Sequence, residues 1–193
     1  MCINLETSVI SFILGVNYGW KLFQTNVKQY QVIGLFAICI SLIQLVEACI
    51  YFFGTKWYII LNKILLICLG LQGFFIFHTH KTIFNQQHYL YFVTLIILVV
   101  IICKTLSEDF VIEKTKCLDW NFLKHNVLIR KSLFCMYICI LVLLSTNKIY
   151  SKYRNYLLFT YFISEYCIIN NNKPSMWCLT SALITPIFYY NIF

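Results

Sequence analysis

Charged residues are scarce in this chain of 193 residues, of which 11% are charged and 61% are hydrophobic. Soluble domains contain about 25% charged residues and about 45 to 50% apolar residues, counting glycine. A chain this short cannot bury so much apolar side chain in a core, so the excess must face lipid. The same numbers exclude a disordered tail, a secreted disulfide scaffold and a nucleic-acid-binding module.

The ten cysteines and four histidines do not form a metal-binding pattern. No CxxC motif is present, and most cysteines lie inside apolar segments, where free Cys behaves as a small apolar residue. His78, His80 and His88 have no carboxylate or Cys beside them, so we expect neither a metal site nor a cofactor. Cys2 and Cys117 are the one pair for which a disulfide is geometrically feasible.

Long windows without charge divide the chain, because a membrane-spanning helix needs about 20 mostly apolar residues and tolerates charge chiefly at its ends. The 22 residues after Lys81 carry no charge, and the 27 after Lys28 carry only Glu47. The windows predict an all-α fold, a polytopic transmembrane helix bundle that forms a single integral membrane domain over 1–193. Its seven predicted spans are about 8–23, 31–53, 57–77, 88–106, 130–146, 153–170 and 175–193.

The first span is short and contains Asn17, so the alternative is six spans plus an interfacial N-terminal helix. No Lys or Arg precedes its apolar stretch, and we therefore expect the N-terminus to stay attached rather than to be removed as a signal peptide. Residues 107–129 form the one long connection, with basic, acidic and aromatic residues interleaved. That mixture suits an interfacial helix, and a solvated loop is the alternative.

Neither charge nor glycosylation motifs fix the orientation of this layout in the membrane. Nine Lys and Arg residues lie on its N-terminal side and six on the other, which is close to a draw under the positive-inside rule. No Asn is followed two residues later by Ser or Thr, so glycosylation sites give no further information.

Small residues recur at spacings of three and four in several spans, which predicts helix-contact faces because membrane helices associate by close packing. Gly15 and Gly19 form a GxxxG motif in the first span. The predicted packing residues are Gly15, Gly19, Gly34, Ser41, Gly70, Gly73 and Ala182. Residues 95–102 of the fourth span include no small residue, so we expect this span at the periphery, with most of its surface on lipid.

Two acidic residues lie within predicted spans, where a charge costs about 2.5 to 3.5 kcal/mol on insertion scales. Glu47 lies about six residues before the second span ends, and Asn62 and Lys63 lie about five residues after the third begins, at a common depth of about 8 to 9 Å. We expect a Glu47 to Lys63 ion pair or a Glu47 to Asn62 hydrogen bond. Glu165 lies on the order of 10 Å from the same face. The candidate polar cluster is Gln44, Glu47, Asn62, Lys63 and Glu165, capped by Trp177.

This cluster has two interpretations. It either joins three helices structurally or binds a cation, a proton or a small polar ligand, and the structural role leads because modest hydrogen bonds between helices are common in membrane bundles. Neither acid lies in a recognisable catalytic motif, so we assign no catalytic residue and expect no enzyme. The last span lacks the lysine of a retinal protein, and no internal repeat of the kind common in secondary transporters is visible.

Short motifs in a fixed order extend along nearly the whole chain. They are Met1-Cys2 followed by Ser8, Gln44-x-x-Glu47, Asn62 and Gln72, Cys117-x-x-Trp120, and Ser175-x-Trp177-Cys178 followed by Pro186. Together they resemble an uncharacterised family of multi-pass membrane proteins that are encoded by large nucleocytoplasmic DNA viruses of the mimivirus kind and by some cellular organisms. The resemblance implies no activity, and it implies that the marked positions cluster on one side of the membrane.

We therefore expect a multi-pass integral membrane protein of structural or interaction type, in a host or virion membrane if the chain is viral. Its expected partners are the lipid bilayer and either other membrane proteins or further copies of the chain, and no nucleic acid. The alternative is a transporter or channel for a small solute, an ion or protons that uses the buried acidic residues.

Overall fold

The fold is all-helical in the part of the chain that the structure, a computed structural model, describes. It describes residues 5–53, 57–85, 88–107, 127–169 and 184–193, without the side chains of 58, 130 and 160–169. The all-α class predicted from the sequence is confirmed. The helices are α1 (Leu5–Phe23), α2 (Lys28–Phe53), α3 (Tyr58–Phe84), α4 (Leu90–Ser107), α6 (Val127–Leu143), α7 (Lys148–Ile169) and a last helix over 184–190.

Three of these helices are long and apolar enough to cross a membrane by length and composition: Lys28–Phe53, Ile59–Phe84 and Leu90–Ser107. They coincide with the charge-free windows after Lys28 and Lys81 and with the apolar stretch between them. This supports a membrane protein with long apolar helices, and the seven-span layout stays a prediction.

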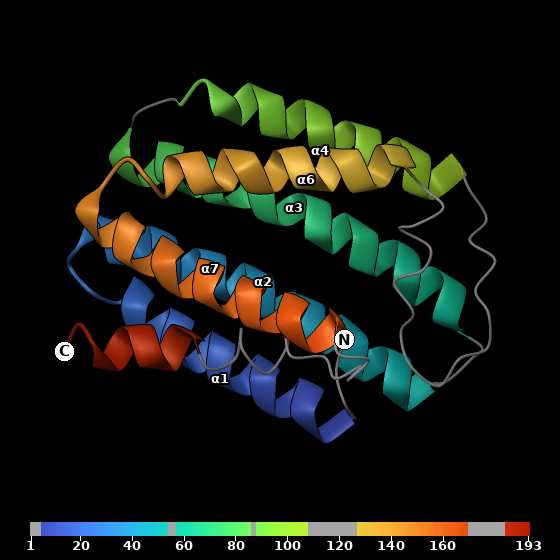
Figure 1. Ribbon diagram of the computed structural model, residues 1–193, viewed down its shortest axis with the longest axis horizontal. Coiled ribbons are helices and arrows are strands. Elements are labelled where there is room, and N and C mark those ends of the chain that lie inside the picture. Colours follow the sequence, from blue (N-terminus) through green and yellow to red (C-terminus); the bar gives the residue numbers. More distant parts are fainter. Residues whose placement is uncertain (1–4, 54–56, 86–87, 108–126, 170–183) are drawn as a thin grey trace.

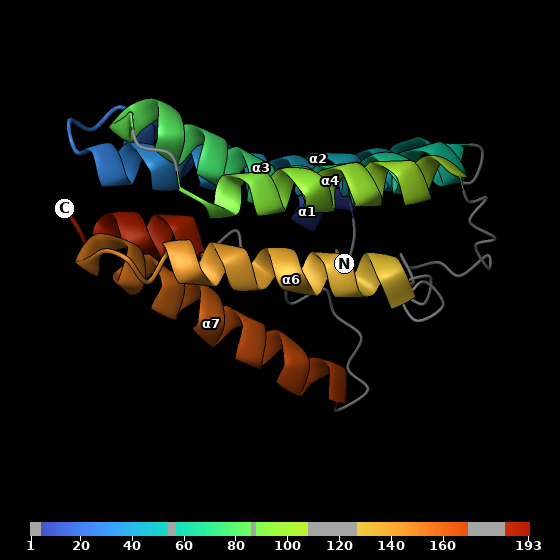
Figure 2. The same ribbon diagram turned by 90° about the horizontal axis from the view of Figure 1, so that it is seen from above.

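The helices form two layers. Helices α1, α2, α3 and α4 lie side by side in chain order in one layer, and α6, α7 and the helix over 184–190 form the second (Figures 1 and 2). Helix α2 contacts α1, α3 and α7, whereas α3 contacts α2, α4 and α6. The buried core lies between the layers and is made of aliphatic and aromatic side chains from both.

Helix α4 lies at the edge of the first layer, as the lack of small residues in its sequence predicts. Only 22% of its apolar window is buried, against 61% for α2. Its buried residues form one narrow stripe of Thr94, Leu98, Ile101 and Thr105. The other α4 side chains are exposed or only partly buried, because its bulky aliphatic side chains allow close approach only along that stripe.

The end of α3 differs from the predicted span. The helix continues through the polar residues 78–81 to Phe84, whereas the predicted span ends at 77. Polar side chains do not interrupt a helix, since its backbone hydrogen bonds are made within the segment itself. The helix ends where Asn85 adopts a left-handed conformation with φ 53°, which Asn tolerates better than most residues.

The last predicted span, 175–193, also differs. Its helix ends at residue 190, and in the turn that follows the backbone N–H groups of Ile192 and Phe193 both donate to the Tyr189 carbonyl oxygen, at 3.1 and 3.3 Å. Residues 170–183 lie outside the described residues, and so do 108–126 of the long connection, so the predicted interfacial helix over 107–129 stays a prediction. Helix α6 ends at Leu143, before the predicted 146, and α7 begins at Lys148, before the predicted 153.

Candidate functional site

The two polar residues of α2 that were predicted to form a site are deeply buried in an apolar bundle. Gln44 is 2% exposed and Glu47 is 1% exposed, although neighbouring positions of the same helix, such as Leu45, are open. Both lie in the second half of α2, on the face that carries Ser41 and Ala48. A carboxyl group in this position is uncommon, because removing a charge from water costs free energy unless other groups satisfy it.

Helix α3 supplies the polar residues opposite. Asn62 is 3% exposed and Lys63 is half-buried, and both lie in the first turns of α3, which runs antiparallel to α2 and packs against it. Glu47 lies six residues from the end of α2 and Asn62 four residues from the start of α3, so their depths along the bundle agree to within about 3 Å. The structure thus brings these residues onto two packed helices, and the pairing of Glu47 with Lys63 or Asn62 stays a prediction.

The rest of the predicted cluster is only partly described. Glu165 belongs to α7, a helix that contacts α2, but its side chain is not among those that the structure describes. Trp177 and Ala182 lie in 170–183 and are not described at all. The cluster that the structure describes is therefore Gln44, Glu47, Asn62 and Lys63.

The predicted packing residues of α1 and α2 meet at the contact between these helices. A Cβ on Gly15 would overlap the Ser41 side chain, and one on Gly19 would lie 2.8 Å from the Gly34 carbonyl oxygen. Ser41 Oγ donates a hydrogen bond to the Ala37 carbonyl oxygen at 2.7 Å, which satisfies its hydroxyl within α2. The helices therefore approach as closely as their backbones permit.

The two predicted packing glycines of α3 face different neighbours. A Cβ on Gly70 would lie 3.1 Å from Leu98 Cδ1 of α4, and one on Gly73 would overlap the Met136 side chain of α6. Helix α3 thus uses one glycine for contact within its layer and the other for contact between the layers.

The described residues were compared with the predictions about metal ligands and disulfides. Among the residues the structure describes, no group of three His, Cys, Asp or Glu is placed to hold a metal ion. Six cysteines in these ranges are free thiols: Cys39, Cys49, Cys68, Cys103, Cys135 and Cys139. The predicted pair of Cys2 and Cys117 lies outside them.

A second polar site, which the sequence analysis did not identify, lies between α3 and α7. The ring centroids of His80 and Tyr150 are 6.1 Å apart, and His80 also stacks on Phe84 at 4.7 Å. Tyr150 is 1% exposed. Neither His80 Nδ1 nor the Tyr150 hydroxyl has a hydrogen-bond partner among the residues described. The spacing of Tyr150 and Tyr153 in the sequence indicates that both lie on one helix face. It does not indicate that a histidine lies opposite them.

His88 lies beside this second site, in the connection between α3 and α4. Its Nδ1 accepts a hydrogen bond from the Leu90 backbone N–H at 3.3 Å, and its ring lies on Phe77 and Tyr89 at 5.5 and 4.7 Å. Burial lowers the pKa of His88, because the charged imidazolium loses hydration. The neutral ring therefore keeps Nδ1 available as an acceptor for the start of α4.

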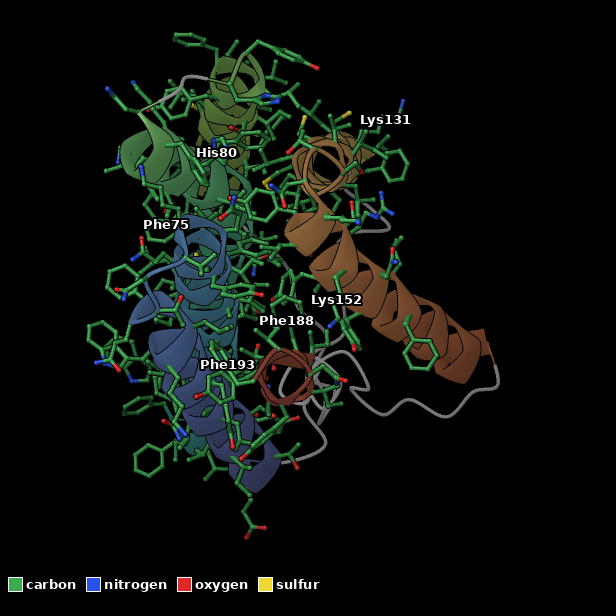
Figure 3. All side chains as sticks on the ribbon, turned by 90° about the vertical axis from the view of Figure 1, so that its left-hand side faces the viewer. Phe75, His80, Lys131, Lys152, Phe188 and Phe193 are labelled. Atoms are coloured by element: carbon green, nitrogen blue, oxygen red, sulfur yellow. The ribbon has the colours of Figure 1, made fainter. Side chains whose placement is uncertain are left out.

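The C-terminal helix inserts an aromatic anchor between the two layers. Phe188 is fully buried, and its ring lies 4.9 Å from that of Tyr153 and 6.2 Å from that of Tyr30 (Figure 3). At the helix surface, the Tyr18 and Tyr190 hydroxyls are hydrogen-bonded at 2.9 Å, which joins α1 to the C-terminal helix. The last helix thus connects elements from both ends of the chain.

Comparison of the chain with protein-family models, with curated proteins and with solved structures found no match.

Proposed function

We propose that this chain is a multi-pass integral membrane protein of structural or interaction type, with seven spans. The observation that carries the proposal is the surface of α4. Phe92, Val93, Ile96 and Val99 are all exposed there, on a helix long and apolar enough to cross a membrane. Isolated exposed apolar side chains are ordinary, but a contiguous apolar surface along a whole helix indicates lipid or a protein partner.

The contact between α1 and α2 supports a role in assembly. Glycine-mediated contact of two backbones is typical of helix association in lipid, where close packing replaces the hydrophobic effect. Gln44, Glu47 and Asn62 are polar residues buried inside the bundle. In membrane bundles such residues commonly form hydrogen bonds that join helices. The partners in such an assembly are other membrane proteins or further copies of the chain. The order of the short sequence motifs favours a host or virion membrane.

Proton or small-solute transport is the second candidate, and one observation favours it. Glu47 is a carboxyl group with 1% exposure inside an apolar bundle, where acidic residues are expensive and are used in proton and ion pathways. The structural role and the transport role make opposite demands on this group. Transport needs it to change its protonation or ligand state, whereas a structural joint needs only its hydrogen bonds.

The test compares wild type with Glu47→Gln and with Glu6→Gln as the matched control, since Glu6 is exposed at the start of α1. Each protein is reconstituted into liposomes loaded with a pH-sensitive dye, and its thermal stability is measured in detergent. For the structural role we expect no flux in any of the three and a change in stability for Glu47→Gln alone. Flux in wild type that Glu47→Gln abolishes would establish transport instead.

A further inference from the structure

Among the residues that the structure describes, one end of the bundle carries basic side chains and no Asp or Glu side chain. It is the end where α1, α3 and α6 finish and α2, α4 and α7 begin, at the left of Figure 1 and facing the viewer in Figure 3. Its six cations are Lys21, Lys28, Lys81, Lys148, Lys152 and Arg154. Of the acidic residues in the described ranges, Glu6 lies at the start of α1, Glu47 in the second half of α2 and Glu165 in the last turns of α7, all toward the opposite end. We call it the basic end.

The lysines of the first layer at the basic end lie over aromatic rings. Lys21 Nζ is 4.7 Å from the Tyr18 ring centroid, and Lys81 Nζ is 5.1 Å from that of Tyr91. A ring face attracts a cation weakly and leaves its charge in place. These ammonium groups therefore lie over aromatic rings without being neutralised.

Two of the three cations of α7, Lys152 and Arg154, are held by neutral oxygens. Lys152 Nζ donates to the Asn191 carbonyl oxygen at 3.0 Å, and Arg154 donates to Ser145 Oγ at 2.7 Å and to Asn155 Oδ1 at 3.1 and 3.3 Å. An ammonium group has three N–H donors, so Lys152 keeps two for another acceptor. Within the described residues, none of the six cations contacts a carboxylate.

A groove begins beside Lys152. It is lined by Lys152, Asn155, Tyr156 and Phe159, so its polar lining lies toward the start of α7 and its aromatic lining farther along the helix. Phe159 is largely exposed, and Tyr156 is half-buried. Over about two turns of α7, from Lys152 to Phe159, the groove thus passes from an ammonium group to an apolar surface, which is the order of polarity in a phospholipid from headgroup to acyl chain.

We propose that the basic end binds anionic phospholipid headgroups, with the α7 groove as the seat of one lipid. Lys152 contacts the headgroup phosphate, and the acyl chain lies along Tyr156 and Phe159. The five other cations attract the same class of lipid to the surrounding annulus. This inference rests on the proposed membrane location, and it adds that the leaflet around this end is the one rich in anionic lipid.

The aromatic residues favour lipid over other anionic partners. Tyrosines are enriched at the level of the headgroups in membrane proteins, and Tyr18, Tyr89, Tyr91 and Tyr190 all lie at the basic end. A soluble acidic partner would need cations but no apolar groove. The groove next to Lys152 gives an acyl chain a place that such a partner would leave empty.

The test titrates the full-length protein in a mild detergent with dioleoyl phosphatidylglycerol or dioleoyl phosphatidylcholine and counts bound lipid by native mass spectrometry. We expect wild type to bind the anionic lipid more tightly. Lys152→Gln should weaken that binding about fivefold and leave the zwitterionic lipid unchanged, since each cation near an anionic surface is worth about one such factor. Lys152→Arg should retain the preference.

Lys131→Gln is the matched control. Lys131 is also an exposed lysine on a helix of the second layer, but it lies near the start of α6, about 18 Å along the helix from its end at Leu143. We expect it to change neither affinity. The inference is overturned if Lys131→Gln weakens anionic lipid binding as much as Lys152→Gln does, or if wild type binds the two lipids equally.

A salt titration of wild type keeps the inference testable if Lys152→Gln does not fold. Raising the ionic strength from about 0.1 to about 1 M shortens the screening length from about 10 to about 3 Å, and it should reduce binding of the anionic lipid only. Inorganic phosphate is the further competitor. Full displacement of the lipid by millimolar phosphate would reveal a site for free anions and contradict the proposal.

Failure of this inference differs from failure of the proposed function. A protein that incorporates into vesicles of pure phosphatidylcholine but shows no preference for anionic lipid supports the membrane location and overturns the inference. A protein that does not incorporate into either kind of vesicle overturns both. Incorporation is measured by flotation of the vesicles on a density gradient.

Discussion

Gly19 of α1 and Gly34 of α2 face each other backbone to backbone. A methyl group on Gly34 would overlap the Gly19 carbonyl oxygen and lie 2.6 Å from the Phe23 backbone nitrogen. Neither atom is the end of a flexible side chain, so the contact can be relieved only by moving one helix away from the other. The packing of α1 therefore depends on the absence of a single carbon atom at this position.

Gly34→Ala should destabilise the protein by about 1 to 3 kcal/mol, the usual cost of adding a methylene to a filled interior. The measurement is thermal unfolding in detergent, followed by circular dichroism. Gly70→Ala is the matched control in a helix that also packs on both sides. Its new Cβ would meet only the side-chain ends of Leu98 and Ile101, at 3.1 and 3.3 Å, and these can shift. Equal losses of stability in the two variants would show that helix approach is not what Gly34 permits.

The sequence was informative about such contacts because they depend on residue size and spacing. The GxxxG motif of the first helix marks a face, and the structure places Gly15 and Gly19 of that face against Ser41 and Gly34. Which helix lies opposite was inferred from chain order, since consecutive antiparallel helices are neighbours by default. That rule does not extend to the second layer, where α7 contacts α2 across the chain.

Tyr150 and Tyr153 provide a second prediction, because they are two buried tyrosines on the same helix that differ in whether the hydroxyl group is hydrogen-bonded. Both are 1% exposed. Tyr153 is hydrogen-bonded to the Thr185 side chain, whereas the Tyr150 hydroxyl has no partner in the described structure. Tyr150→Phe should leave stability unchanged or raise it, since it removes a buried polar group that makes no bond.

Tyr153→Phe should lower stability by about 0.5 to 1.5 kcal/mol, because it removes the hydrogen bond to Thr185. Both variants keep the ring, so packing against Phe188 is unchanged in the Tyr153 variant and the comparison isolates the hydroxyl. The two values come from the same unfolding experiment. A greater loss for Tyr150→Phe than for Tyr153→Phe would mean that the Tyr150 hydroxyl is bonded.

Phe188 carries a third prediction about the C-terminal helix. Its ring is fully buried between Tyr30, Tyr153 and Tyr156, so Phe188→Ala should cost about 3 to 5 kcal/mol. Ile187→Ala, one residue away on the exposed face, should change stability by less than about 0.5 kcal/mol. Similar effects from the two substitutions would show that the last helix does not dock on the bundle.

The sequence predicted helix in this C-terminal segment but not its surroundings. An apolar and aromatic run has the same pattern whether its partner is lipid or another helix, so the sequence predicts a span over 175–193. The anchor is set by Tyr30 and Tyr153, which are distant in the chain and carry no signal of their pairing with Phe188. The end of α3 differs from the end of the predicted span for another reason: the apolar stretch ends before His78, whereas the helix continues to Phe84 and ends at Asn85.

The candidate polar cluster was predictable only in part, because depth along a helix can be counted but rotation about it cannot. Glu47 and Asn62 were expected to lie at one depth on adjacent helices, with Gln44 one turn deeper, and all three are buried. Charged residues in apolar windows are conspicuous in a sequence. The contact between His80 and Tyr150 was not predicted, because neither residue type is unusual at the end of a membrane helix and only the packing of α7 on the bundle brings their rings together.

Lipid exposure of α4 yields the last prediction, and it uses two positions of one helix. Ile96 and Leu106 have the same exposed fraction, 63%, but Ile96 lies near the middle of α4 and Leu106 lies one residue before its end. Ile96→Lys should reduce membrane insertion by about 2.5 to 3.5 kcal/mol, because it places a charge at the centre of the hydrocarbon. Leu106→Lys should cost much less, since a lysine at a helix end extends its ammonium group to the headgroups. Insertion is measured by in vitro translation into microsomes with an engineered glycosylation tag that reports the location of the segment after α4. If α4 faced water, the two lysines would have the same small free energy cost, because the two sites are equally exposed. Equal insertion of the two variants would therefore contradict a membrane-spanning α4.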